Sequence, residues 1–237
     1  DKEDVAHQLR KYDLLALPVL DTDGLLVGIV TFDDAMDVMV EEATEDITKM
    51  AAVAPREKTY FEVSAWEHAK RRIPWLLVLM FSSIITGTII TRYEDAFAAI
   101  PLLVSFIPML MDTGGNCGSQ SSTLIIRGIA LNQVTFHDFF RVIWKEFRVS
   151  LIVGVVLAIA NGLRIYLTYQ QAGMAIVIAL SLVATVISAK LLGCILPMCA
   201  KKIGLDPALM ASPLITTIVD ASSIMIYFFI ATKVCHL

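Results

Sequence analysis

The sequence has few charged residues for a chain of 237. Only 18% of its residues are charged, whereas 57% are hydrophobic and the mean hydropathy is +0.70. Soluble globular domains average about 25% charged and roughly 45–50% apolar residues. The composition excludes an intrinsically disordered chain, which requires low hydrophobicity, and it argues against a purely soluble enzyme.

Cysteine and histidine are also scarce, with four of each. The cysteines stand in apolar surroundings and form no CxxC pair, so we expect neither a disulfide framework nor a zinc site. The sequence contains no P-loop, GxSxG or HExxH motif. We therefore expect no enzymatic activity, and the net charge of −4 argues against a nucleic-acid partner.

The charges gather at the N-terminal end, where residues 1–72 carry 25 of the 42 charged side chains. The remaining chain contains five apolar segments, at about 73–92, 97–131, 142–165, 174–198 and 212–233. Most of them reach the roughly 20 apolar residues needed to cross a membrane. The second is interrupted by Asp112–Asn116. We expect an all-α membrane protein with five transmembrane helices.

Positive charges beside these segments predict an orientation. With the N-terminus in the cytoplasm, eight cations lie at cytoplasmic ends: Arg71, Arg72, Arg127, Arg141, Lys145, Arg148, Lys201 and Lys202. Arg92, Arg164 and Lys233 lie on the far side, so the positive-inside rule favours a cytoplasmic N-terminus and an external C-terminus. Lys190 falls within the fourth segment and is expected to extend toward the cytoplasmic interface.

Residues 1–40 have the pattern of a fragment of an α/β domain. Apolar runs at 14–20 and 25–30 flank a turn signal at residues 21–24. Residues 31–34 (TFDD) form a variant of the helix capping box. One or two strands and one helix cannot close a core, so we expect this segment to be the closing part of a larger domain.

The next segment, residues 35–72, is polar and has a helical pattern with a break expected near residues 54–55. Glu42, Glu45 and Asp46 are spaced i, i+3 and i+4 and therefore share a helix face, where like charges repel. A bound cation would offset this repulsion. A solvated acidic face is the alternative.

A carboxylate lies near the middle of the last apolar segment. Asp220 would cost at least about 2.5–3.5 kcal/mol to insert there, so a function is the default expectation. Ser212, Thr216, Ser223 and Tyr227 share one helical stripe with it. The stripe predicts an ion route, and an interhelical hydrogen-bond seam is the alternative.

The glycine-rich run at residues 111–123 places polar groups at membrane depth, where they must face protein or water. Asp112 and Asn116 are spaced i, i+4 and offer oxygen atoms to one path, and oxygen is the ligand that Mg²⁺ prefers. A GxxxG helix-packing motif in the same run is the alternative. Asp206 precedes a proline in the loop before the last segment, and it gains interest only if the acidic cluster reaches it.

Residues 107–120 (IPMLMDTGGNCGSQ) and 212–220 (SPLITTIVD) resemble the signature of the MgtE family of magnesium channels. Residues 41–46 and 71–76 are similar to that family's connecting helix and to the start of its first span. Residues 23–31 resemble the closing half of a CBS domain. The resemblance covers essentially the whole chain, in the same order.

The resemblance implies three parts: the C-terminal part of a CBS domain over residues 1–40, a connecting (plug) helix region over 41–72, and a five-helix transmembrane pore domain over 73–237. It implies a homodimer in the lipid bilayer of the inner cell membrane, with a pore on the two-fold axis. Mg²⁺ would pass passively through the pore and, from the cytoplasm, would also close it. Thr31 and Asp34 match residues with which some complete CBS domains bind ATP.

The resemblance also assigns roles to the polar residues. Asp220 would be the ion-binding carboxylate facing its symmetry mate, although some family members carry Asn where this chain has Ser212. The candidate Mg²⁺ ligands of the pore are Asp112, Asn116, Ser212, Thr216 and Asp220, and those of the regulatory cluster are Glu42, Glu45, Asp46 and Asp206.

Two other interpretations stay open at this point. In a proton- or Na⁺-coupled secondary transporter for divalent cations, Asp220 and Asp112 would exchange the coupling ion for the metal. A CBS-containing membrane sensor that transports nothing is the third possibility.

Overall fold

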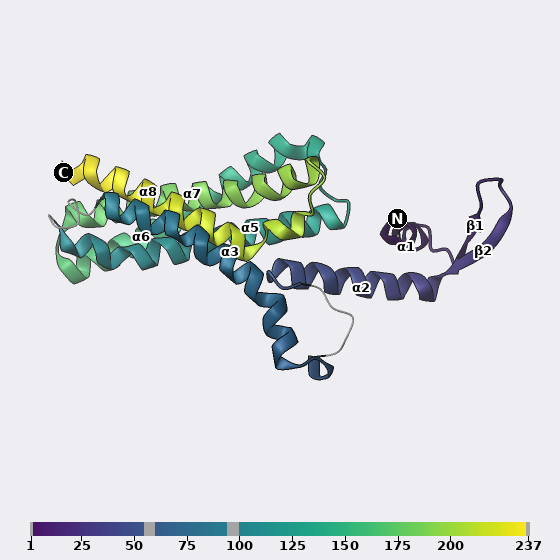
Figure 1. Cartoon of the computed structure of the whole chain (residues 1–237). Helices are drawn as coiled ribbons and strands as arrows, with labels where there is room; N and C mark the ends of the chain where they lie inside the picture. The colour runs from purple at the N-terminus through teal and green to yellow at the C-terminus, as the bar shows by residue number, and fades with distance from the viewer. Residues whose placement is uncertain (1, 55–59, 94–99, 236–237) are drawn as a thin grey trace.

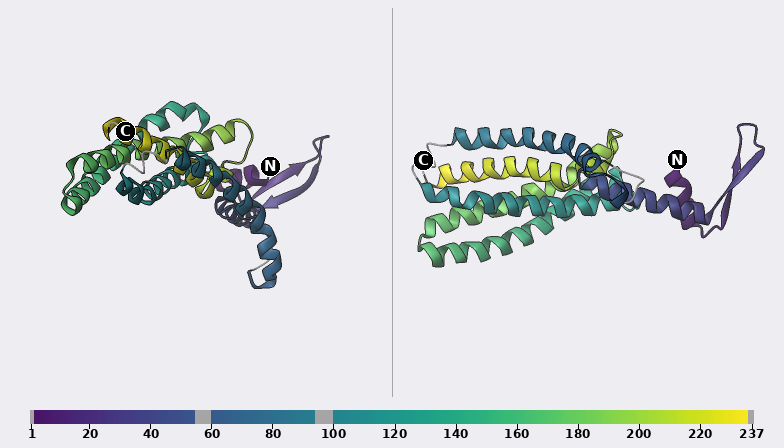
Figure 2. Two further views of the ribbon diagram at one scale, coloured as in Figure 1. Left: turned by 60° about the vertical axis from the view of Figure 1, so that its left-hand side comes forward. Right: turned by 60° about the horizontal axis from the view of Figure 1, so that its bottom comes forward.

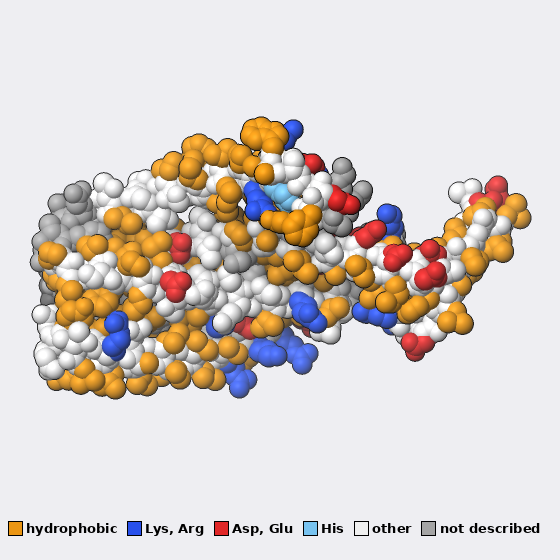
Figure 3. Space-filling view, turned by 90° about the horizontal axis from the view of Figure 1, so that it is seen from below, with side chains coloured by type: hydrophobic (Ala, Val, Ile, Leu, Met, Phe, Trp, Pro, Cys, Tyr) orange, Lys and Arg blue, Asp and Glu red, His pale blue; other side chains and the backbone are white. Residues whose placement is uncertain are grey.

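The computed structural model describes residues 2–54, 60–93 and 100–235. Long helices lie side by side in a bundle, and a smaller N-terminal part projects from one end of it (Figures 1 and 2). Hydrophobic side chains cover much of the bundle surface, whereas charged side chains are concentrated where the bundle meets the projecting part and along that part (Figure 3).

The projecting part begins with α1 (Lys2–Lys11) and two strands, β1 (Ala16–Leu20) and β2 (Leu26–Thr31), which pair antiparallel. The Asp21 carboxylate accepts hydrogen bonds from the backbone N–H groups of Asp23 and Leu25, which confirms the predicted turn. This hairpin leaves several apolar side chains exposed, as a two-stranded sheet without a covering layer must.

Helix α2 (Phe32–Met50) starts at the predicted capping box. The Asp34 carboxylate accepts hydrogen bonds from the backbone N–H of Thr31, at 3.0 Å, and from its hydroxyl, at 2.6 Å. The helix continues without a break past residue 41, so the acidic cluster lies on the helix that leaves the hairpin. Helix α2 ends at Met50, a few residues before the break predicted near 54–55. Pro55 lies outside the described residues.

The bundle begins with the short turn η1 (Tyr60–Glu62) and helix α3 (Ala65–Arg92), and contains α5 (Ile107–Ala130), α6 (Phe139–Tyr169), α7 (Ala172–Lys202) and α8 (Ser212–Cys235). Three short 3-10 helices connect them: η2 (Pro101–Phe106), η3 (Phe136–Asp138) and η4 (Pro207–Met210). Four helical segments of the described chain are long and apolar enough to cross a membrane, at Ala65–Arg92, Phe136–Tyr169, Ala172–Lys202 and Pro207–Cys235.

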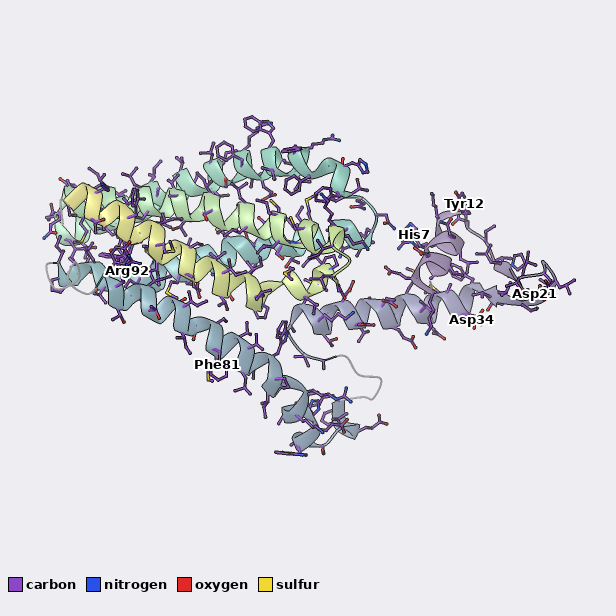
Figure 4. The ribbon with its side chains drawn as sticks, turned by 45° about the horizontal axis from the view of Figure 1, so that its top comes forward. His7, Tyr12, Asp21, Asp34, Phe81 and Arg92 are labelled. Atoms are coloured by element: carbon purple, nitrogen blue, oxygen red, sulfur yellow. The ribbon has the colours of Figure 1, made fainter. Side chains whose placement is uncertain are left out.

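Helix α7 is the centre of the bundle and packs against α5, α6 and α8. Val177, Ile178, Leu182 and Val186 on α7 are completely buried. Helix α3 is different, because it packs mainly along α8 and leaves most of its apolar surface open. Phe81 of α3, for example, points away from the bundle (Figure 4).

The interruption predicted at Asp112–Asn116 is wrong, because α5 runs as one helix through the glycine-rich run. Close packing explains the difference. A methyl group at Gly114 would lie 2.9 Å from Val219 of α8, and one at Gly118 would lie 2.7 Å from Ile215 of the same helix. The contacts that these glycines permit offset their low helix propensity.

Gly193 on α7 marks a close approach to α5. A methyl group there would collide with the carbonyl oxygen of Gly118 and lie 3.1 Å from Cβ of Ser121.

We expect Gly193→Ala to destabilise the protein by about 1–3 kcal/mol, as overpacking does, and to lower the melting temperature in detergent. Gly87→Ala on α3 is the matched control, because the added methyl has no atom of the described chain within 4 Å apart from its own neighbours along the helix. Equal melting of Gly193→Ala and wild type would contradict this packing.

Candidate functional site

One face of α5 carries polar side chains that no described part of the chain covers fully. Asp112, Asn116, Gln120 and Thr123 recur at i, i+4, i+8 and i+11, and all four are exposed. The opposite face is buried against α7 and α8. A polar stripe among membrane-length helices must face water or protein, so it marks one wall of a candidate cation path.

Asp220 of α8 lies beside this wall. A Cβ atom added to Gly115 of α5 would lie 3.9 Å from Oδ1 of Asp220 and 3.1 Å from Cγ2 of Thr216. The absence of that side chain therefore lets both residues approach α5. Asp112 lies three residues before Gly115, one turn along α5 from this contact. The structure thus brings Asp112, Thr216 and Asp220 together, with Asn116 one turn away on the same face of α5.

Two other residues of the predicted polar stripe on α8, Ser223 and Tyr227, are buried inside the bundle and do not face this path. The hydroxyl of Tyr227 is buried and donates a hydrogen bond of 2.9 Å to the carbonyl oxygen of Leu103, which fits the interhelical seam. Ser223 is also buried, against Gly114. The Thr216 hydroxyl donates to the Pro213 carbonyl of its own helix, and the side chain of Ser212 lies outside the described residues.

Lys190 does not extend to the membrane interface, so that prediction is wrong. Its side chain is only 5% exposed, and its Nζ donates to Ser121 Oγ at 3.3 Å. Ser121 in turn donates to Glu146 Oε2 at 2.7 Å. The buried ammonium group therefore finds a partner inside the bundle, and this chain of hydrogen bonds links α7, α5 and α6.

Glu42 and Asp46 of α2 lie at the end of the bundle, where they line a pocket of about 360 Å³. Its acidic lining residues are Glu3, Glu42, Asp46 and Asp206. Asp206, which caps η4 by accepting from the Ala208 N–H at 2.8 Å, is also 2.6 Å from Lys49 Nζ. Lys49 forms a second ion pair with Glu45. The acidic cluster therefore reaches Asp206, and Glu3 joins it from α1 without having been predicted.

The electrostatics of this pocket favour a cation. Burial, followed by the charges of Glu3, Glu45 and Asp46, raises the pKa of Glu42. Burial, followed by the charges of Asp206 and Glu3, raises the pKa of Asp46. Burial opposes the charged form of Lys49, but its hydrogen bonds to Asp206 and Glu45 outweigh that effect and raise the pKa of the ammonium group. A further cation would relieve the remaining repulsion.

Within the described ranges, no three Asp, Glu, His or Cys side chains converge closely enough to hold a metal ion directly. The carboxylates of the pocket and of the α5–α8 wall supply oxygen ligands of the kind that hard cations prefer. Mg²⁺ usually keeps several water molecules when it binds. Both places therefore fit a hydrated divalent cation held partly through water.

Comparison with known proteins identifies the family. Residues 107–230, which include α5, α6, α7 and most of α8, match the MgtE family, described as a divalent cation transporter. Residues 2–41 match a CBS domain. The chain belongs to the MgtE family. The resemblance noted in the sequence is thereby confirmed, together with a small CBS remnant.

Three relatives are each named magnesium transporter MgtE. The chain is 39% identical to that of Bacillus subtilis over 236 residues, which is 100% of this chain and 52% of the relative. It is 38% identical to that of Thermus thermophilus over 231 residues, 98% of this chain and 51% of the relative. It is 35% identical to that of Enterococcus faecalis over 232 residues, which is 98% of this chain and 51% of the relative. The chain thus spans about half the length of these relatives.

Proposed function

We propose that this chain forms the Mg²⁺-conducting part of a magnesium transporter of the MgtE family and that permeation is passive. The observation that carries the proposal is the exposed polar face of α5 beside Asp220, in a bundle of otherwise apolar helices. The names of the relatives, all magnesium transporters, support Mg²⁺ as the transported ion.

The proposed membrane domain has five transmembrane helices, with α5 added to the four apolar ones. Its 24 residues span about 36 Å at 1.5 Å per residue, which is enough to cross the hydrocarbon core. Its polar residues lower its hydropathy because they line the path. The N-terminal part would lie in the cytoplasm and the C-terminus outside, across the inner cell membrane, as the lysines and arginines indicate.

A homodimer would cover the polar face of α5. Two copies around a two-fold axis would bring their α5 faces together, since a two-fold interface uses the same patch of each subunit. Each copy would contribute one Asp220, and a pair of carboxylates attracts one hydrated divalent cation. Binding of the cation through its water molecules is weak enough to let the ion leave again, as conduction requires. Two charges crossing about 100 mV release roughly 4.6 kcal/mol, which would drive the flux.

Regulation would come from the pocket at the end of the bundle. Cytoplasmic Mg²⁺ bound near Glu42, Glu45, Asp46 and Asp206 would favour the closed arrangement and shift the population toward it. Support comes from the contact of α2 with η4, the turn that precedes α8 and its Asp220. ATP is not included in the proposal, because Thr31 and Asp34 bond to each other in the cap of α2.

The pore proposal predicts the effect of removing the carboxylate at the centre of α8. In full-length protein in proteoliposomes, Asp220→Ala and Asp220→Asn should each lower voltage-driven Mg²⁺ flux about tenfold or more, because a loss of 1.4 kcal/mol in cation binding is already tenfold. Ser222→Ala is the matched control, since this hydroxyl donates only to Val219 of its own helix among the described residues. Wild-type flux through both Asp220 variants would place the path elsewhere.

The regulatory proposal predicts the response to cytoplasmic Mg²⁺. The triple variant Glu42→Gln/Glu45→Gln/Asp46→Asn should need about tenfold more Mg²⁺ for closure, the equivalent of 1.4 kcal/mol, because the pocket loses negative charge. The control variant Asp37→Asn/Glu41→Gln removes two exposed acids of the same helix that do not line the pocket. Patch-clamp recording of the full-length protein measures both. Closure of the triple variant at the wild-type concentration would refute the regulatory role.

A further inference from the structure

We propose that a groove between α2 and α3 binds a phospholipid with an anionic headgroup. The groove has a volume of about 780 Å³, within the range of ligand-binding clefts. The end of α2 and the residues after it form one side, the first half of α3 forms another, and Leu209 of η4 closes it. It is separate from the polar face of α5, so it has no part in the proposed cation path.

One face of α3 forms the long wall of the groove. The residues of this face follow the spacing i, i+3, i+4, i+7, i+8 and i+11, and are Glu67, Lys70, Arg71, Pro74, Trp75 and Val78. The first three are charged and the last three are apolar. The polarity of the wall therefore changes along the helix axis. A phospholipid aligned with the helix has the same order, with a charged headgroup followed by acyl chains.

The groove spans the level at which α3 would enter the membrane. The apolar stretch of α3 starts at Ile73, directly after Arg71 and Arg72. Trp75 lies within the first turn of that stretch, at the depth where tryptophan is enriched in membrane proteins. The charged end of the groove therefore lies at headgroup level, and its apolar end, with Val78, lies at acyl-chain level.

The charges of the groove select an anionic headgroup. Among the described residues of its lining, three are cations, Lys49, Lys70 and Arg71, and one is an acid, Glu67. Arg71 pairs with Glu67 at 2.9 Å, and Lys49 is bound to acids of the neighbouring pocket. Lys70 is exposed and forms no ion pair within the described part of the chain. Its ammonium group is the one available to a lipid phosphate, for which lysine is a common ligand.

The groove also has a structural link to the acidic pocket. Lys49 lines both, and its ammonium group donates to Asp206 of the acidic pocket at 2.6 Å. A lipid in the groove would therefore contact the residue that holds α2 against η4.

Quenching of Trp75 by brominated lipids tests the proposal directly. In the full-length protein, every tryptophan except Trp75 is replaced by phenylalanine, Trp66 and Trp144 included. The protein is reconstituted in phosphatidylcholine with increasing fractions of brominated phosphatidylglycerol or brominated phosphatidylcholine. We expect phosphatidylglycerol to bind beside Trp75 about fivefold more strongly, the effect of one lysine near the membrane surface. Lys70→Gln should bring the ratio close to one.

Lys145→Gln is the matched control, because Lys145 is a cation of α6 outside the groove. It should leave the fivefold preference intact. Equal quenching by the two lipids in the wild-type background would overturn the anionic site. An absence of quenching by either lipid would also overturn it, since the groove would then be covered by a second copy of the chain. Loss of the preference in Lys145→Gln would show general surface charge instead of a site.

Discussion

Small side chains at the contacts of α5 with α7 and α8 hold a polar helix inside an apolar bundle. Gly114, Gly115 and Gly118 lie where any side chain would meet α8 at close range, and a side chain at Gly193 of α7 would collide with α5. The glycine-containing face of α5 can therefore pack closely against α7 and α8. Because this packing holds α5 in place, its opposite face can carry the carboxylate of Asp112 and the amides of Asn116 and Gln120. The same close packing lets Asp220 of α8 approach the proposed path.

Polar contacts join this helix to the acidic pocket. Lys49 of α2 binds Asp206, which caps η4, and η4 ends at Met210. The carbonyl oxygen of Met210 accepts a hydrogen bond of 2.6 Å from Ser122 of α5. The same turn leads into α8. A change in the position of α2 therefore has a route of direct contacts to both helices that form the proposed path, as a regulatory role of the pocket requires.

Local signals in the sequence predicted local structure well. The Asp21 turn, the Thr31 cap and the face shared by Glu42 and Asp46 depend on neighbours within a few residues, so spacing was sufficient. The continuity of α5 was not predictable, because the packing that offsets its glycines comes from helices that are distant in the chain. Tertiary contacts also decide that Lys190 is buried, because its partners Ser121 and Glu146 come from two other helices.

The most direct test of the central claim is Mg²⁺ flux into proteoliposomes of the full-length protein, with the voltage and the pH difference across the membrane controlled independently. Passive permeation along α5 and Asp220 predicts flux that follows voltage and the Mg²⁺ gradient at any pH difference. Uptake driven by a pH difference or a Na⁺ gradient at zero voltage, against the Mg²⁺ gradient, would contradict the account. It would show a coupled transporter in which the carboxylates exchange ions.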